Sequence, residues 1–151
     1  MPQSLSNVLV HIVFSTQDRQ PFLRHRALCE AMHKYLASVW ARRGCPVIKV
    51  GGVEDHVHML ARQARMIALT EWVKELKRAS SLWVKEAPEG ACFFQWQAGY
   101  GAFSVSQSHS SAVERYIIRQ EQHHRRVSFQ EEFRKLLDRH QVAYDDRYVW
   151  D

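Results

Sequence analysis

The order of strand-like and helix-like segments constrains the fold of this chain more than any other feature of its sequence. An apolar, β-branched run at residues 8–14 predicts a buried strand, and apolar positions at helical spacing predict a helix over residues 23–43. Two strand-like runs, 47–53 and 56–60, are separated by a two-residue turn and predict a hairpin, and a second helix is predicted over 70–85. The remaining predicted elements are a strand at 92–96, a loop or short strand at 99–106, and helices with capping-box starts at 111–126 and 128–140.

This order, β-α-β-β-α-β followed by helices, is that of a ferredoxin-like (split βαβ) fold. We therefore predict an α+β protein whose antiparallel sheet carries helices on one face and is followed by a C-terminal helical region. The length of 151 residues suits one compact domain, and no repeat, low-complexity stretch or linker divides it. Residues 1–151 are expected to form a single domain.

The composition narrows the class of protein further. The net charge of +5, from 21 Lys and Arg against 16 Asp and Glu, favours an anionic partner such as nucleic acid, although the same charge also serves solubility. The three cysteines are far apart and odd in number, which excludes a Cys-x-x-Cys zinc site and argues against a disulfide framework. No apolar run approaches the roughly 20 residues of a membrane span, and no signal-peptide pattern is present. We expect a cytoplasmic protein with no membrane partner.

The motif His56-Val57-His58 lies within the third predicted strand. Residues i and i+2 of a strand face the same side, so the two imidazoles project together and are able to bind one divalent metal. Asp55 precedes them and either orients a ring or shapes the turn. The alternative is two polar residues on a sheet face. A catalytic metal site would also need a third ligand and an open position for substrate.

Tyr116 and Gln120 share one face of the third predicted helix, because they are four residues apart. A Gln carbonyl oxygen is a hard metal ligand, and a Tyr hydroxyl is a candidate nucleophile. Ionising a free Tyr at pH 7 costs roughly 4 kcal/mol, and a metal that polarises the phosphoryl group under attack offsets much of that cost. The combination favours covalent phosphodiester cleavage. The alternative is a core tyrosine beside a solvated glutamine, and the sequence leaves open whether the two elements meet.

The His-x-His strand, together with the segment from Tyr116 to Gln120, carries a resemblance that extends over nearly the whole chain. Further similar segments are 13–16, 51–56, 96–106, 123–126 and 148–150. In this combination the chain resembles the single-tyrosine HUH transposases of the smallest bacterial insertion sequences. The repeat-associated tyrosine transposases are close relatives of that family.

The resemblance implies a bacterial or archaeal, metal-dependent transposase. Such an enzyme cleaves and rejoins single-stranded DNA at hairpin-marked element ends through a covalent 5′-phosphotyrosine intermediate. By this match Tyr116, on a C-terminal catalytic helix, is the nucleophile, and His56, His58 and Gln120 bind Mg or Mn. The expected partners are single-stranded DNA with hairpins and a second copy of the chain, in a homodimer. Three alternatives remain: a host-domesticated nuclease acting on chromosomal palindromic repeats, a non-catalytic nucleic-acid-binding module, and a zinc hydrolase that uses the histidine pair without the tyrosine.

Five basic residues are predicted to contact DNA phosphates. Lys74, Lys77 and Arg78 share a face of the second predicted helix, Arg62 follows the His-x-His strand, and Arg19 lies in the first loop. A solvated, charged helix face is the alternative for each of them.

Overall fold

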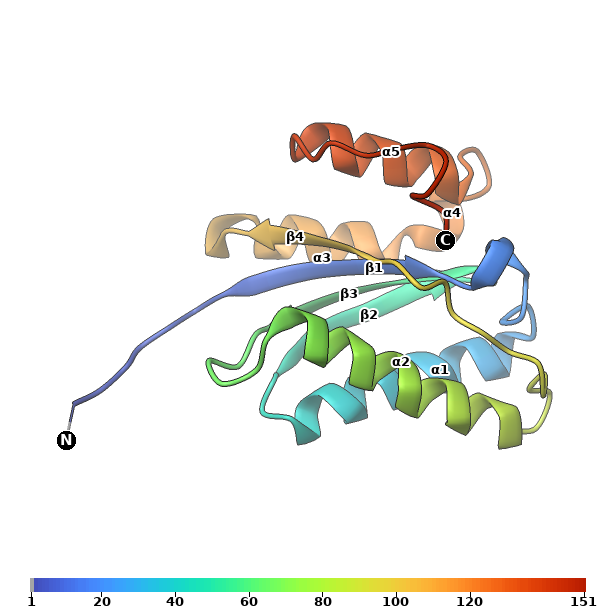
Figure 1. Ribbon diagram of the computed structural model, residues 1–151, viewed down its shortest axis with the longest axis horizontal. Coiled ribbons are helices and arrows are strands. Elements are labelled where there is room, and N and C mark those ends of the chain that lie inside the picture. Colours follow the sequence, from blue (N-terminus) through green and yellow to red (C-terminus); the bar gives the residue numbers. More distant parts are fainter. Residues whose placement is uncertain (1) are drawn as a thin grey trace.

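The computed structural model describes residues 2–151 and confirms the predicted α+β class (Figure 1). Four strands form one antiparallel sheet in the order β2-β3-β1-β4. The two central strands are β3 and β1, so the His-x-His motif lies in the interior of the sheet. The strands are β1 (Leu9–Ser15), β2 (Val47–Val53), β3 (His56–Arg62) and β4 (Gly101–Val105).

Two long helices, α1 (Arg26–Arg42) and α2 (Leu69–Glu86), cover one face of the sheet (Figure 1). Their apolar stripes meet in the main core, where Trp40 packs against Trp72 with ring centroids 4.2 Å apart. Val57 points from β3 into this core and is fully buried. Because side chains alternate along a strand, the residues on either side of Val57 face the other way.

The opposite face of the sheet is covered by α3 (Ser110–Ile118), α4 (Gln120–His123) and α5 (Phe129–Arg139), as Figure 1 shows. Gly51 of β2 lets α3 approach closely, because a Cβ atom there would lie 2.7 Å from the backbone oxygen of Ile117. α5 packs through an apolar stripe that contacts Val13 and Phe103 of the sheet. Two short 3-10 helices complete the fold, at Gln17–Arg19 and Gln107–His109.

The prediction of the fourth strand at residues 92–96 was wrong, whereas the alternative of a short strand within 99–106 is confirmed. In the first segment only Trp96 forms a bridge, to Thr16. Phe94 and Trp96 pack into the main core, whereas Phe93 is exposed, and the Trp96 indole donates to Ser80 Oγ at 2.9 Å. Apolar character in this segment therefore reflects packing rather than strand pairing. The edge strand is β4, which pairs with β1.

The helix predicted over 111–126 is shorter and interrupted. Its regular geometry ends at Arg119, where φ is −90° and ψ is 12°, and a separate turn, α4, follows. The predicted Ser111 cap is absent, since the helix begins one residue earlier without a side-chain cap. The other predicted cap is confirmed: Ser128 Oγ accepts a hydrogen bond from the backbone N–H of Glu131 at 3.2 Å. None of the helices within residues 2–151 is long and apolar enough to cross a membrane.

Candidate metal centre and active site

Strand β3 directs both histidines of the His-x-His motif toward α3, α4 and α5, and both side chains are fully buried. A third histidine, His11 on the neighbouring strand β1, lies beside them. Its Nε2 atom is 2.8 Å from Nδ1 of His58, and the two rings stack. This contact holds the His58 ring with Nε2 directed away from β1, toward the space under α5.

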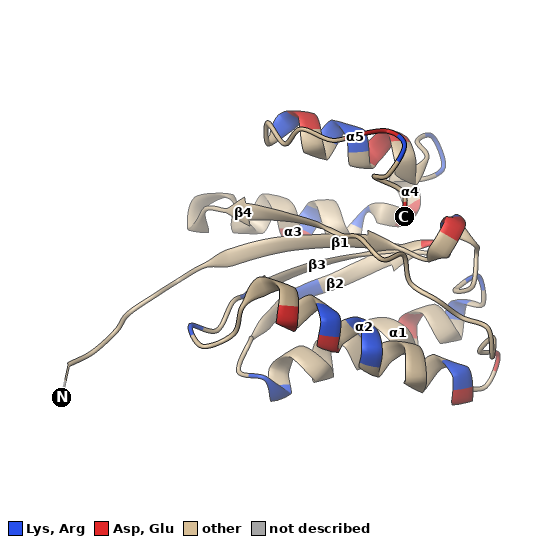
Figure 2. Ribbon diagram, in the orientation of Figure 1, with Lys and Arg blue, Asp and Glu red and all other residues tan. Residues whose placement is uncertain are grey.

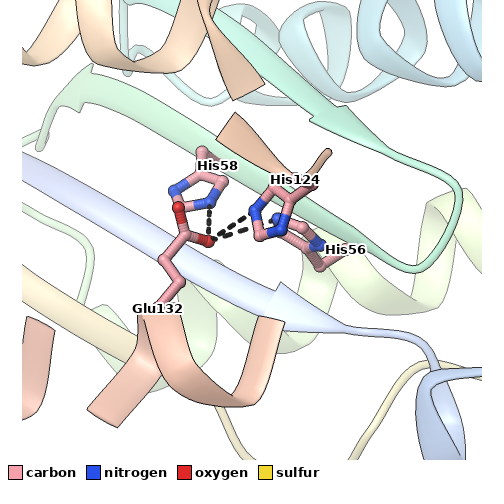
Figure 3. A group of neighbouring side chains, drawn as sticks. All are labelled: His56, His58, His124 and Glu132. Atoms are coloured by element: carbon pink, nitrogen blue, oxygen red, sulfur yellow. Dashed lines mark hydrogen bonds and ion pairs between the residues drawn. The ribbon is translucent and has the colours of Figure 1, made fainter. Parts of the chain in front are cut away.

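Glu132 of α5 reaches into that space, where its Oε1 atom meets three imidazoles (Figure 3), and its Oε2 atom lies 3.3 Å from a fourth, that of His123. The Oε1 atom lies 2.9 Å from Nε2 of His58, 3.0 Å from Nε2 of His124 and 3.3 Å from Nε2 of His56. One donor atom from each of the four residues lies within 4.8 Å of all the others. We call these four residues the His/Glu cluster.

The outward-facing nitrogens of the cluster are also held in place. Nδ1 of His56 is 2.7 Å from a carboxylate oxygen of Asp55, which therefore orients the ring, one of the two roles considered for this residue. Nδ1 of His124 donates to the carbonyl oxygen of Val127 at 2.7 Å. Partners on the outer nitrogen fix the tautomer and leave the inner nitrogen free to bind a metal. The cluster is thus preorganised from outside.

The donor set and its spacing suit a divalent metal. Ligands about 2.1 Å from one ion lie roughly 3 to 3.5 Å from one another, and the three contacts of Glu132 Oε1 fall at 2.9–3.3 Å. Imidazole nitrogens with a carboxylate oxygen are common ligands of first-row divalent metals. Residues of the His/Glu cluster could therefore hold such an ion.

Without a metal the cluster is an ion pair. Burial opposes a charge on His56, but its hydrogen bonds to Asp55 and Glu132 raise the pKa of this imidazole to about 9. Burial lowers the pKa of His58 to about 4, against the attraction of Glu132. Despite its own burial, the surrounding histidines hold the pKa of the Glu132 carboxyl below its ordinary value. A proton on His56 thus compensates the buried carboxylate.

Tyr116 and Gln120 join the cluster from α3 and α4. The helix interruption does not separate them, because both side chains donate to Oε2 of Glu132, the glutamine at 2.9 Å. Oε1 of Gln120 lies 3.0 Å from Nε2 of His56. Burial and the Glu132 carboxylate raise the pKa of the Tyr116 phenol above its ordinary value. The structure therefore brings the predicted nucleophile and the three predicted metal ligands together within one chain.

No metal-site role was predicted from the sequence for three residues of the site: His11, His124 and Glu132. The sequence did contain a signal for Glu132: it is the one charged residue on the apolar face of α5. The other buried positions of this helix are Phe129, Phe133, Leu136 and Leu137. His124 continues the four-residue spacing that links Tyr116 and Gln120. Nothing in the sequence connects His11 to the motif, because only strand pairing places β1 beside β3.

The basic residues of α2 lie in the helical layer on the other side of the sheet from the cluster (Figures 1 and 2). The Lys77 ammonium is directed inward, and burial lowers its pKa to about 8. It donates at 2.6–3.2 Å to three backbone carbonyls, those of Gln97, Ala98 and Gly99. Arg78 forms an ion pair with Glu75 at 2.8 Å, and Lys74 is exposed. Lys77 therefore holds the loop before β4 against α2, and the three hydrogens of its ammonium are used in these hydrogen bonds.

The other two predicted DNA contacts also lie apart from Tyr116. The Arg19 guanidinium packs over the ring of Trp150 at 5.8 Å from its centroid. Arg62 donates to the side chain of Asn7 at 2.8 Å. A role for these residues in DNA contact stays a prediction.

Comparison with known proteins gives the site its family context. The family model described as "Transposase IS200 like" matches residues 4–120, which is most of the chain. The chain belongs to the IS200-like transposase family. No curated protein matches this family member.

Two solved structures share the fold of this IS200-like transposase. One is described as a candidate transposase from Deinococcus radiodurans R1, with a TM-score of 0.60, 19% identity, and coverage of 80% of this chain and 95% of its own. The other is a REP-associated tyrosine transposase bound to a REP hairpin, with a TM-score of 0.60, 12% identity, and coverage of 82% and 72%. The family match ends at Gln120, so His124 and Glu132 of the His/Glu cluster lie beyond it.

Proposed function

We propose that this IS200-like transposase cleaves and rejoins single-stranded DNA at hairpin-marked ends, with Tyr116 as the nucleophile and Mg or Mn as the metal. The observation that carries the proposal is the convergence of the Tyr116 hydroxyl, Gln120 and both motif histidines on one carboxylate. A solvated helix face or a core tyrosine gives no reason for these groups to meet. A nucleophile beside preorganised metal ligands is the arrangement that phosphodiester transfer requires.

The residues proposed to hold the metal are His56, His58 and Gln120, and Glu132 and His124 lie in position to add to them. When bound, a divalent metal polarises the phosphoryl group and stabilises negative charge on the leaving oxygen. The chain itself orients the rings through Asp55 and other outer partners, and α5 covers the cluster. The Glu132 carboxylate orients the Tyr116 hydroxyl by accepting its hydrogen bond through Oε2.

The proposed step exchanges one ester bond for another. The Tyr116 oxygen attacks phosphorus, a Tyr–O–P bond forms, and the bond from phosphorus to the 3′-oxygen breaks. The phenol proton leaves to solvent, and the departing 3′-oxygen takes a proton and becomes a 3′-hydroxyl. Attack of a 3′-hydroxyl on the phosphotyrosine reverses the step, so strands are rejoined without a separate energy source.

The test is a search for a denaturant-resistant protein–DNA adduct. The protein is incubated with Mn and a single-stranded oligonucleotide that carries a hairpin and a label on the 3′ side of the cleavage position. We expect labelled protein from the wild type and none from Tyr116→Phe, which should still bind the oligonucleotide. Tyr100→Phe is the matched control, because Tyr100 packs at the main core rather than beside the cluster, and it should form adduct as the wild type does.

The same assay separates the alternatives. A binding module would retain the oligonucleotide without cutting it. A zinc hydrolase would cut without an adduct and would not need Tyr116. An adduct that survives Tyr116→Phe would refute the nucleophile assignment.

The proposal includes a homodimer, as the family resemblance implies. In such a dimer the Tyr116 helix serves either the histidine pair of its own chain or that of the second copy, because the linker over residues 99–110 is long enough for both arrangements. Light scattering with and without hairpin DNA measures the association state. Adduct formation by a monomer would separate the chemistry from the dimer.

A further inference from the structure

Four arginines surround a hollow beside Tyr116. The hollow has a volume of about 710 Å³ and is formed by α3, α4 and the turn after α4. Its arginines are Arg115, Arg119, Arg125 and Arg126, and its wall contains no Asp or Glu from residues 2–151. We call it the arginine hollow. Figure 2 shows basic colouring on α3, on the same side of the sheet as α5.

The charges of the arginine hollow are not neutralised by the described chain. All four arginines are exposed, and none forms an ion pair within residues 2–151. The arginines that do pair with a carboxylate lie elsewhere: Arg26, Arg43, Arg78, Arg134 and Arg147. Arg115 and Arg119 are one helical turn apart, where like charges repel. Gathered cations of this kind are stabilised by a bound polyanion.

The position of the hollow links it to the nucleophile. Tyr116 lines the arginine hollow and also a second hollow of about 490 Å³ between β4, α3 and α5. Glu132, which accepts the hydrogen bond of the Tyr116 hydroxyl, lines the second one. The nucleophile therefore lies at the boundary of the two hollows. A strand that lies in the arginine hollow and continues into the second passes beside Tyr116.

We propose that the arginine hollow binds the backbone phosphates of the single strand on one side of the scissile phosphate. The inference rests on the proposed function and adds to it the path of the substrate. Guanidinium groups bind phosphate oxygens through paired hydrogen bonds, and such contacts position a strand without reading its sequence. Arg125 and Arg126 lie beyond the segment matched by the family model, so half of the arginines of the hollow are not part of that match.

The experiment measures binding in the Tyr116→Phe background, so that no adduct forms. Fluorescence anisotropy with a labelled single strand gives Kd at several salt concentrations for two double variants, Arg115→Gln/Arg119→Gln and Arg125→Gln/Arg126→Gln. We expect each to weaken binding by roughly tenfold or more and to reduce the salt dependence by about 1.4 in log–log slope, for two lost phosphate contacts. The corresponding Arg→Lys doubles should recover most of that slope, because the charge is kept.

The matched control removes the same number of positive charges from the helices on the opposite face of the sheet. Lys34 and Arg42 are exposed on α1, beneath the sheet, so Lys34→Gln/Arg42→Gln should leave Kd and slope close to those of the parent. Equal losses in the control and the hollow variants would show that only net charge matters and would overturn the inference. Unchanged binding in the hollow variants, while the wild type still forms its adduct, would overturn the strand path alone. Lost binding in the hollow variants without any wild-type adduct would refute the proposed chemistry and support the hollow as a phosphate site.

Discussion

Gly51→Ala tests whether the close approach of α3 to β2 positions the nucleophile. A Cβ atom at Gly51 would lie 2.7 Å from both Cγ2 and the backbone oxygen of Ile117, whereas ordinary contacts begin near 3.4 Å. The backbone oxygen cannot rotate away, and the buried, β-branched side chain of Ile117 has little room to do so, so α3 has to retreat by about 0.7 Å, the difference between these distances. Tyr116 is the neighbour of Ile117 and must move with it.

The expected loss of activity follows from that displacement. Misplacing a reacting group by 1 Å costs on the order of 100-fold, so a retreat of about 0.7 Å should slow adduct formation by roughly 10- to 100-fold. Crowding of this kind also costs about 1–3 kcal/mol of stability. Single-turnover adduct formation measures the rate, and urea unfolding measures the stability. Binding of Mn should fall less than the rate, because His56 and His58 stay on β3.

Gly44→Ala is the control, because it should lower the stability by a similar amount but lies far from the site. Gly44 has φ +74°, and a Cβ there would meet no atom within 4 Å. The variant should therefore lose about 1 kcal/mol through backbone strain alone and form adduct at the wild-type rate. A wild-type rate in Gly51→Ala would refute the argument. An equal drop in rate for the two variants would attribute the loss to stability rather than to position.

Three further predictions concern other parts of the molecule. Lys77→Met leaves three backbone carbonyls without their donor, so the free energy of unfolding measured in urea should fall by about 1–3 kcal/mol. The exposed control Lys74→Met should change it by no more than about 0.5 kcal/mol. Equal stability of the two variants would contradict a structural role for Lys77. Because the pKa of His56 is raised to about 9, Mn has to displace a proton below that pH, so its affinity should rise up to about tenfold per pH unit from pH 7 to 9 and then level off. Calorimetry in two buffers should detect the released proton, and an affinity independent of pH would count against His56 as a ligand. Cleavage should require a single strand, since unpairing duplex DNA costs about 1.4 kcal/mol per base-pair step; equal cutting of the matching duplex would defeat the single-strand mechanism.

The sequence by itself determined the elements whose signals are local. The strand at β1, the hairpin of β2 and β3, the helices α1 and α2, and the Ser128 cap all follow from side-chain period and capping within a few residues. The shared face of His56 and His58 follows from the period of a strand alone. Four-residue spacing likewise placed Tyr116 and Gln120 together, even though the helix between them is interrupted.

Only the tertiary structure decided how the site is completed and which basic groups are free. Glu132 contacts His58 although 74 positions separate them in the sequence, and His11 contacts His58 across 47 positions. No repeat of side chains within one helix or strand predicts such contacts. The same holds for Lys77, which faces inward, although the sequence does not distinguish it from a lysine on an exposed helix surface. Local patterns report which way a side chain points from its own element. What it meets there depends on the packing of elements distant in sequence, which is why the carboxylate at the centre of the candidate site came from a helix that the sequence assigned no role.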